Sequence, residues 1–332
     1  MSDSGQPIPL TLVTGFLGSG KTTLLNALLR HPDFAGTAVL VNEIGSVGID
    51  HSLVVGASDD VLLLEGGCLC CQPKGSIADG VSRLLAMQPP PQRIVIETSG
   101  AANPLPVLES LSQHPRAGTG FRFPRVVTLV DCVLAGSTLD RHAEAGFQIC
   151  AADLLVLTKT DIAGPGDRAA ADAILASTNP TAARVVGAGA TLPDGFVDLV
   201  DRPLDPSSAR GERAPTQTEP AHASSEFTTV ALQFDGCLDA ADVQSWIDQV
   251  LGLYASNILR IKGILNVSGL ARPAALQCVR DIVHPIELID PLATDGTNTT
   301  NSIVAIGWDM HPELLSEALG WLADHARQSG RR

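Results

Sequence analysis

Residues 15–22 read Gly15-Phe16-Leu17-Gly18-Ser19-Gly20-Lys21-Thr22, which matches the pattern G-x-x-x-x-G-K-[S/T]. The segment follows an apolar run over residues 8–14 and opens a helical pattern over residues 21–31. The backbone N–H groups of such a turn converge on a phosphate, and the N-terminus of the helix adds partial positive charge. We therefore expect a nucleotide phosphate site here, the alternative being a chance match in a Gly-rich loop.

The loop and the first helical turn supply the residues that we expect to contact the nucleotide. They are Gly15, Gly18, Ser19, Gly20, Lys21, Thr22 and Thr23. Lys21 should reach the β- and γ-phosphates, which makes it a catalytic candidate, and Thr22 should ligate Mg²⁺.

Outside this loop, the first 190 residues alternate short apolar runs with helical patterns. Strands are expected at residues 8–14, 37–42, 61–65, 93–97, 125–131, 153–158 and 183–187, and helices near residues 21–31, 75–87, 104–113 and 167–178. Several of the runs are continuously apolar, as in strands covered on both faces. The alternation predicts an α/β fold, a P-loop NTPase domain with a mainly parallel sheet and helices on both faces.

The character of the chain changes after residue 200. Residues 201–226 are rich in Pro, Ala, Ser and Thr, with almost no large apolar side chain, which predicts an exposed flexible linker. Beyond it, strands are expected at 227–234, within 258–267 and 275–290, and at 302–307, with helices at 239–251 and 311–327. The predicted domains are therefore 1–200, a P-loop domain, and 227–332, a small α+β domain with a mostly antiparallel sheet.

The choice of base should depend on Thr158-Lys159-Thr160-Asp161, at the end of the predicted strand 153–158. The segment is similar to the guanine-reading N-K-x-D of GTPases, with Thr in first place. The Asp161 carboxylate can accept hydrogen bonds from guanine N1–H and the 2-amino group, whereas adenine would leave it unpaired. The Lys159 stem can lie along the base, and Thr158 offers fewer hydrogen bonds than Asn. The alternative is an ordinary polar turn.

A second carboxylate is expected on the Mg²⁺ side of the nucleotide. Glu97 ends the apolar run 93–97, and Gly100 follows three residues later. In GTPases of the D-x-x-G type this glycine places a backbone N–H near the γ-phosphate, and the loop acts as a switch. We expect Glu97 and Gly100 to act in this way, with a plain strand boundary as the alternative.

The composition limits the classes of partner. The chain has 332 residues and a formal net charge of −14, which argues against nucleic acid and against an anionic membrane surface. No apolar run approaches the ~20 residues that span a bilayer, and the N-terminus does not resemble a signal peptide. We expect a cytoplasmic location, where disulfides are rare.

Three of the seven cysteines, Cys68, Cys70 and Cys71, fall within four positions. Adjacent thiolates repel one another, and a soft divalent cation removes that repulsion. Sulfur ligation selects Zn²⁺, Co²⁺ or Cu(I), and Glu43, water or a partner side chain could complete an exchangeable site. A redox-active thiol set, a structural zinc and buried cysteines are the alternatives. We expect the other four cysteines to be buried.

The segments GFLGSGKTTLLN, VNEIGSVGID, GCLCC, ETSG and TKTD occur in one order. A first switch is expected at residues 42–45, NEIG, after the second predicted strand, so the cysteines lie between this switch and the one after Glu97. This arrangement resembles the CobW family of metal-trafficking GTPases, which includes cobalamin-pathway proteins, zinc-regulated metallochaperones and nitrile hydratase activators. Residues 258–266, ILRIKGILN, look like the C-terminal V-L-R-x-K-G element of that family. The resemblance implies a slow GTPase that carries Zn²⁺ or Co²⁺ on Cys68, Cys70, Cys71 and Glu43. The His-rich run of many members is missing.

Together these features predict a GTP-hydrolysing metallochaperone that binds GTP, Mg²⁺ and a transition metal and delivers the metal to a client metalloprotein. Two rival interpretations stay open. One is a P-loop kinase or ligase with a structural zinc, which would not need TKTD. The other is a thiol redox switch in which Cys70 and Cys71 oxidise.

Overall fold

The computed structural model describes residues 6–42, 62–66, 76–187, 191–193, 195–201, 226–289 and 300–329. These residues divide into two units. One contains the described residues up to Ala171 together with residues 183–201, and the other contains Asp172–Ala182 together with residues 226–289 and 300–329. Each unit has its own sheet and its own core.

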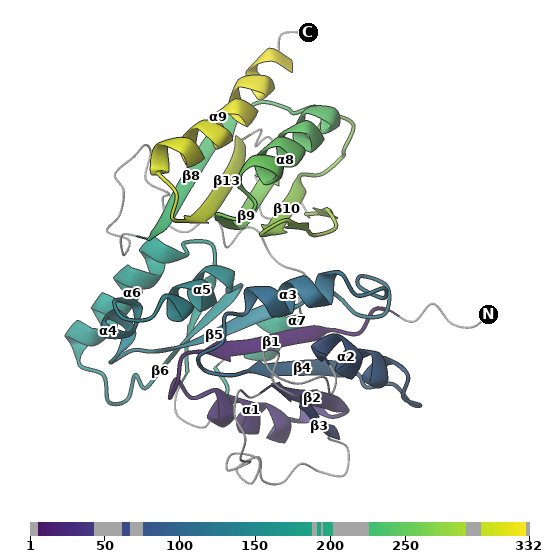
Figure 1. Ribbon diagram of the computed structural model, residues 1–332, viewed down its shortest axis with the longest axis vertical. Helices are drawn as coiled ribbons and strands as arrows, with labels where there is room; N and C mark the ends of the chain where they lie inside the picture. The colour runs from purple at the N-terminus through teal and green to yellow at the C-terminus, as the bar shows by residue number, and fades with distance from the viewer. Residues whose placement is uncertain are drawn as a thin grey trace. The chain divides into compact units, whose positions relative to one another are not determined.

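The first unit is built on a seven-stranded sheet in which all paired strands are parallel (Figure 1). The strands are β1 (Leu10–Gly15), β2 (Thr37–Asn42), β3 (Leu62–Gly66), β4 (Arg93–Thr98), β5 (Arg125–Asp131), β6 (Leu154–Thr158) and β7 (Ala183–Val186). Their spatial order is β3-β2-β4-β1-β5-β6-β7. The predicted α/β fold is confirmed, and the predicted strands agree with it to within two residues at each end.

Helices cover both faces of this sheet. They are α1 (Lys21–Arg30), η1 (Pro32–Phe34), α2 (Ile77–Leu85), α3 (Leu105–Ser112), α4 (Ala135–Leu139), α5 (Ala143–Ala151), α6 (Pro165–Thr178) and α7 (Phe196–Asp201). α1 and α7 share one apolar core with the strand face that carries Val13 and Val127. α2 packs on the opposite face, so closely that a Cβ on Gly80 would lie 2.5 Å from Leu40 Cδ1. α5 lies on that opposite face too, because the Thr128 hydroxyl donates to one of its carbonyls.

The second unit is an antiparallel sheet with two long helices (Figure 1). Its strands are β8 (Phe227–Asp235), β9 (Ile258–Leu265), β10 (Ala274–Val279), β11 (Ile282–Val283), β12 (Glu287–Leu288) and β13 (Thr300–Trp308), in the order β11-β10-β9-β13-β8 with β12 beside β10. Helices α8 (Ala240–Tyr254) and α9 (Pro312–Ser329) share its core, where Trp246 Nε1 donates to the Ala318 carbonyl at 2.6 Å. The predicted α+β class is confirmed.

The opposite face of this second sheet is also buried and carries charge. Arg260 and Lys262 of β9 are 2% and 6% exposed. Lys262 Nζ donates to the Thr181 carbonyl at 3.3 Å, and Thr229 Oγ1 donates to the Thr178 carbonyl at 3.0 Å. The end of α6, from Asp172 onward, therefore belongs to the second unit.

The scattered cysteines differ from one another in burial. Cys132, Cys150 and Cys278 are buried, as expected, and burial raises the pKa of the Cys278 thiol to about 12. Cys237 is exposed, so that part of the prediction is wrong. It lies in the turn after β8, where its neighbour Leu238 takes the fully buried position.

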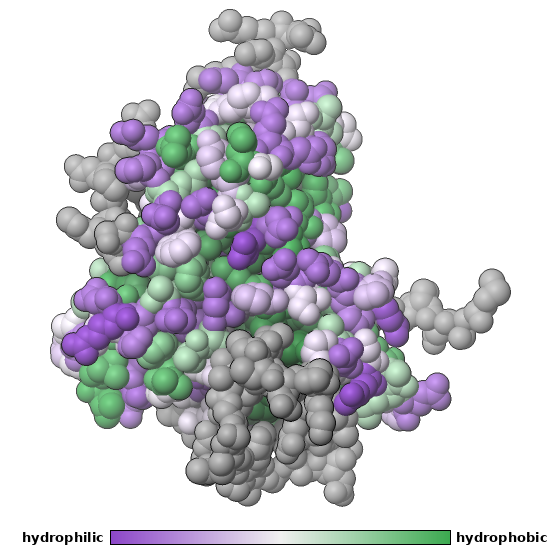
Figure 2. Space-filling view, viewed as in Figure 1, coloured by the Kyte–Doolittle hydropathy of each residue, from purple (hydrophilic) through white to green (hydrophobic). Residues whose placement is uncertain are grey.

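The surface of the described residues mixes polar and apolar side chains, and Figure 2 shows the two kinds interspersed over the visible face of both units. None of the described helices combines the length and the apolar character needed to cross a bilayer.

Candidate nucleotide site

Parallel strand register gathers the predicted site residues at one edge of the first sheet. Gly15 at the end of β1 pairs with Leu129 of β5, and Asp131 at the end of β5 pairs with Thr158 of β6. On the other side of β1, Val13 pairs with Glu97 of β4. Ligands of open parallel sheets bind outside these carboxyl ends.

The loop between β1 and α1 has the shape that a phosphate requires. Gly15 has a φ of +143°, and a Cβ there would lie 2.5 Å from the Leu129 carbonyl oxygen, so only glycine fits against β5. Gly18 has a φ of +74°, and a Cβ there would meet no atom within 4 Å, which marks the open side of the loop. Ser19 is 2% exposed, and its hydroxyl finds no hydrogen-bond partner among the described residues.

The first turn of α1 completes the loop. Its N-cap is Gly20, which offers no side-chain cap, and the first turn carries no acidic residue that would compete with an anion. Lys21 Nζ donates to the Gly15 carbonyl at 2.8 Å and to the Phe16 carbonyl at 3.3 Å, so the ammonium group is held inside the loop. Thr22 is half-buried and Thr23 is exposed on the same turn. These contacts fit a triphosphate chain at the helix N-terminus.

The Thr158 hydroxyl makes two hydrogen-bond contacts that the TKTD motif does not predict. It lies 2.8 Å from the Ser19 carbonyl and 3.2 Å from the Val130 carbonyl. The hydroxyl therefore joins the end of β6 to the phosphate loop and to β5. A threonine can make this link with its single O–H, so the residue contributes to the site through the backbone that it holds.

Lys159 and Asp131 form an ion pair that sequence reasoning missed. Lys159 has a φ of +57°, which turns the chain out of β6, and its Nζ lies 2.6 Å from Asp131 Oδ2. The other Asp131 oxygen accepts from the backbone N–H groups of Val133 and Leu134. Asp131 thus fixes Lys159 at the edge of the site, while Asp161 is exposed beyond it. The only signal for Asp131 was a carboxylate at the end of a buried strand.

The loop after β4 lies against the phosphate loop. Glu97 is 8% exposed, and the Thr98 hydroxyl donates to the Thr14 hydroxyl at 2.8 Å, which joins β4 to β1. A Cβ on Gly100 would lie 3.0 Å from the backbone N and Cα of Leu17. The two segments predicted to face the γ-phosphate are therefore in direct contact.

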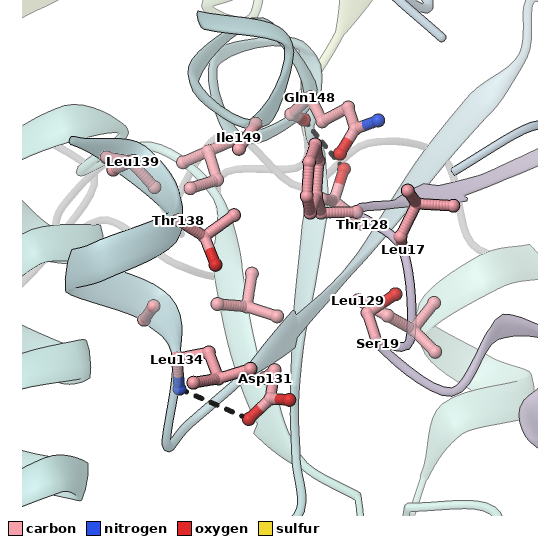
Figure 3. A pocket seen from close by; sticks show the side chains of 14 residues that line it. Leu17, Ser19, Thr128, Leu129, Asp131, Leu134, Thr138, Leu139, Gln148 and Ile149 are labelled. Atoms are coloured by element: carbon pink, nitrogen blue, oxygen red, sulfur yellow. Dashed lines mark hydrogen bonds between the residues drawn. The ribbon is translucent and has the colours of Figure 1, made fainter. Parts of the chain in front are cut away.

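A small open pocket adjoins this contact (Figure 3). Its walls come from the phosphate loop, from the end of β5 and from helices α4 and α5. Of the residues that line it, Leu17 and Leu134 are exposed, whereas Thr128 and Gln148, which lie side by side in Figure 3, are buried. The Phe16 ring stacks on His142 with 4.5 Å between ring centroids, at the N-terminus of α5.

The predicted metal ligands Glu43, Cys68, Cys70 and Cys71 lie outside the described residues. Elsewhere, within the ranges that the structure describes, no three His, Cys, Asp or Glu side chains gather as a metal site. The strands that lead to these ligands are described, however, and Asn42 at the end of β2 pairs with Gly66 at the end of β3.

Two family models of known proteins match successive parts of the chain. Residues 9–186 match the family model of the CobW/HypB/UreG nucleotide-binding domain, and residues 227–322 match the cobalamin synthesis protein CobW C-terminal domain. The zinc chaperone YjiA of Escherichia coli is 30% identical over 272 residues, which are 79% of this chain and 83% of YjiA. The zinc chaperone CobW of Sinorhizobium sp. is 29% identical over 316 residues, 82% of this chain and 85% of that protein.

Solved structures agree on the fold. The Zn(II)-bound YjiA GTPase from Escherichia coli superposes with a TM-score of 0.69 at 23% identity and covers 96% of this chain and 99% of its own.

Proposed function

The chain belongs to the CobW family of P-loop GTPases, and from this premise we propose that it is a metallochaperone that binds Zn²⁺ at Cys68, Cys70 and Cys71 and transfers the metal to a client protein under the control of GTP. Family membership favours a GTPase over the kinase or ligase alternative. Zinc is the preferred cargo because the similar proteins from Escherichia coli and Sinorhizobium sp. are named zinc chaperones. Co²⁺, which has similar ligand preferences, is a second candidate cargo.

The main structural support for this proposal is the pairing of Asn42, at the end of β2, with Gly66, at the end of β3. Neighbouring strands lie about 4.8 Å apart. Glu43 is one residue beyond Asn42, Cys68 is two residues beyond Gly66, and consecutive Cα atoms are about 3.8 Å apart. The described strand ends one residue before Glu43 and two residues before Cys68 are therefore neighbours at the carboxyl-terminal edge of the sheet. Three thiolates and one carboxylate suit an exchangeable Zn²⁺ site.

The register also supports coupling between metal and nucleotide. Glu97 of β4 is the register partner of both Val41 in β2 and Val13 in β1. β4 therefore lies between β2, which precedes Glu43 in the chain, and β1, which precedes the phosphate loop. Any shift of β4 and its following loop on GTP binding acts on both neighbours. Linkage then requires that metal change GTP affinity by the same factor, typically about 5- to 150-fold.

For hydrolysis we assign Lys21 to the β- and γ-phosphates and the Gly100 N–H to the γ-phosphate. Thr22 and Glu97 would hold Mg²⁺, since a hydroxyl and a buried carboxylate are the oxygen ligands that this hard cation prefers. The ion would neutralise phosphate charge when bound. Thr158, Lys159 and Asp161 would form the guanine side of the site, and the second unit offers a surface for a client.

A titration with Co²⁺ as a visible probe tests the metal site. Thiolate ligation should give a charge-transfer band that differs between the GDP state and the state with a non-hydrolysable GTP analogue. Cys70→Ser and Cys71→Ser should remove the band, because a neutral hydroxyl is a poor ligand for a soft cation, while nucleotide binding survives. Cys237→Ser, a change at an exposed cysteine outside the motif, is the matched control and should keep the band.

Two outcomes would overturn the proposal. Equal metal affinity in the two nucleotide states would leave a GTPase without metal coupling. Activity that follows the oxidation state of Cys70 and Cys71 but ignores added metal would favour the redox switch.

A further inference from the structure

Gln148 of α5 is a buried amide that reaches the loop after β4. Gln148 is 1% exposed. Its Nε2 donates to the Gly100 carbonyl at 3.2 Å and to the Ala102 carbonyl at 3.0 Å. Both amide hydrogens are therefore used on one short loop, 46 and 48 residues away in the chain.

The backbone of Gln148 is bound to the sheet. The Thr128 hydroxyl of β5 donates to the Gln148 backbone carbonyl at 2.7 Å, and the two residues lie against each other beside the pocket in Figure 3. Thr128 is 1% exposed, so this contact is dry. The sheet thus fixes the turn of α5 from which the Gln148 side chain projects.

The loop that Gln148 holds is a tight turn. The Ala102 N–H donates to the Ser99 carbonyl at 3.0 Å, which closes the turn over Gly100. On its other side, Gly100 touches the backbone of Leu17 in the phosphate loop. Gly100 is therefore held between the nucleotide loop and the amide of Gln148, and losing the amide would leave two carbonyls without this donor in a buried place.

We propose that Gln148 is a positioning residue for GTP hydrolysis, which holds the turn at residues 99–102 so that the Gly100 N–H faces the γ-phosphate. This inference rests on the role proposed above for Gly100. Gln148 itself touches neither nucleotide nor metal in this scheme. Its effect should fall on the chemical step, because small displacements of a group near the reacting phosphate lower the rate strongly.

Gln148→Met tests this role, since methionine has a similar length but no N–H donors. We expect kcat for GTP to fall on the order of ten- to a hundredfold, with little change in KM and in GDP affinity. Gln148→Glu is a second variant, which keeps the size of the side chain but places acceptor oxygens where the N–H donors stood. GDP binding reports whether each variant is folded.

Thr229→Val is the control. It removes a hydroxyl-to-carbonyl hydrogen bond in the second unit, where Thr229 Oγ1 donates to the Thr178 carbonyl at 3.0 Å, and leaves the contacts of Gln148 intact. It should lower the melting temperature while keeping kcat. Equal loss of kcat in Thr229→Val and Gln148→Met, or an unchanged kcat in folded Gln148→Met and Gln148→Glu, would overturn the inference.

Gly100→Ala separates this inference from the role of Gly100. Its Cβ would press on the Leu17 backbone at 3.0 Å, so kcat should fall. If Gly100→Ala hydrolyses GTP normally, the proposed role of Gly100 is wrong and the inference falls with it. If Gly100→Ala loses activity but the Gln148 variants do not, only the role of Gln148 is refuted.

Discussion

Replacing Thr158 with valine removes the link between the guanine side of the site and the phosphate loop. Valine has nearly the same shape as threonine but no hydroxyl, so the Ser19 and Val130 carbonyls lose a donor at 2.8 Å and 3.2 Å. A neutral hydrogen bond of this kind contributes about 1 kcal/mol net. If that amount is lost mainly from the nucleotide-bound arrangement, the Kd rises about fivefold.

The loss should affect GTP and GDP equally, because the link holds the loop that contacts the phosphates common to both nucleotides. The assay is titration with a fluorescent GDP and a fluorescent GTP analogue, together with thermal unfolding with and without GDP. Thr128→Val is the control here, since it loses a buried hydroxyl-to-carbonyl hydrogen bond on β5, one strand away from Thr158. The reasoning is refuted if Thr158→Val and Thr128→Val lower stability alike and neither changes nucleotide affinity.

Three other predictions concern the remaining site residues and the linker. Asp161→Asn should weaken GTP binding and reduce the preference for GTP over ATP, because the amide cannot accept both guanine N–H groups. Competition titrations measure this preference. Equal affinity of the unchanged protein for GTP and ATP would contradict the base assignment. Lys21→Ala should lower GTP turnover on the order of a hundredfold or more without unfolding the chain. A phosphate-release assay measures the turnover, and a melting curve shows whether the variant is folded. Undiminished turnover would mean that another site hydrolyses GTP. Limited proteolysis should cut first within residues 201–226, because this segment has few apolar side chains that could pack against the rest of the protein. Full protection of the segment would argue against a flexible linker.

Local sequence determined the strands and the phosphate loop. A strand buried on both faces reads as a continuous apolar run, and β2 and β5 match the predicted residues 37–42 and 125–131. The phosphate loop is equally local, because Gly15 to Thr22 are contiguous and one strand–turn–helix unit positions all of them. The apolar run over residues 93–97 also predicted where β4 ends, at Glu97 and Thr98.

Short helices with weak periodicity were not predicted. α5 is only nine residues long and reads AEAGFQICA, which lacks a clear polar face because most of its residues are buried. α4, with five residues, falls below the length at which a helical period can be recognised. The tertiary surroundings stabilise these helices, as the contact of Thr128 with Gln148 illustrates.

Sheet order and the contacts that depend on it were decided by the tertiary structure alone. The order β3-β2-β4-β1-β5-β6-β7 brings Asn42 beside Gly66 and places Glu97 between β2 and β1, whereas these residues are far apart in the chain. Lys159 meets Asp131 across 28 residues, and Gln148 meets Gly100 across 48. A periodic pattern records which face of an element is apolar, but a hydrogen bond between distant residues depends on where packing brings two elements together.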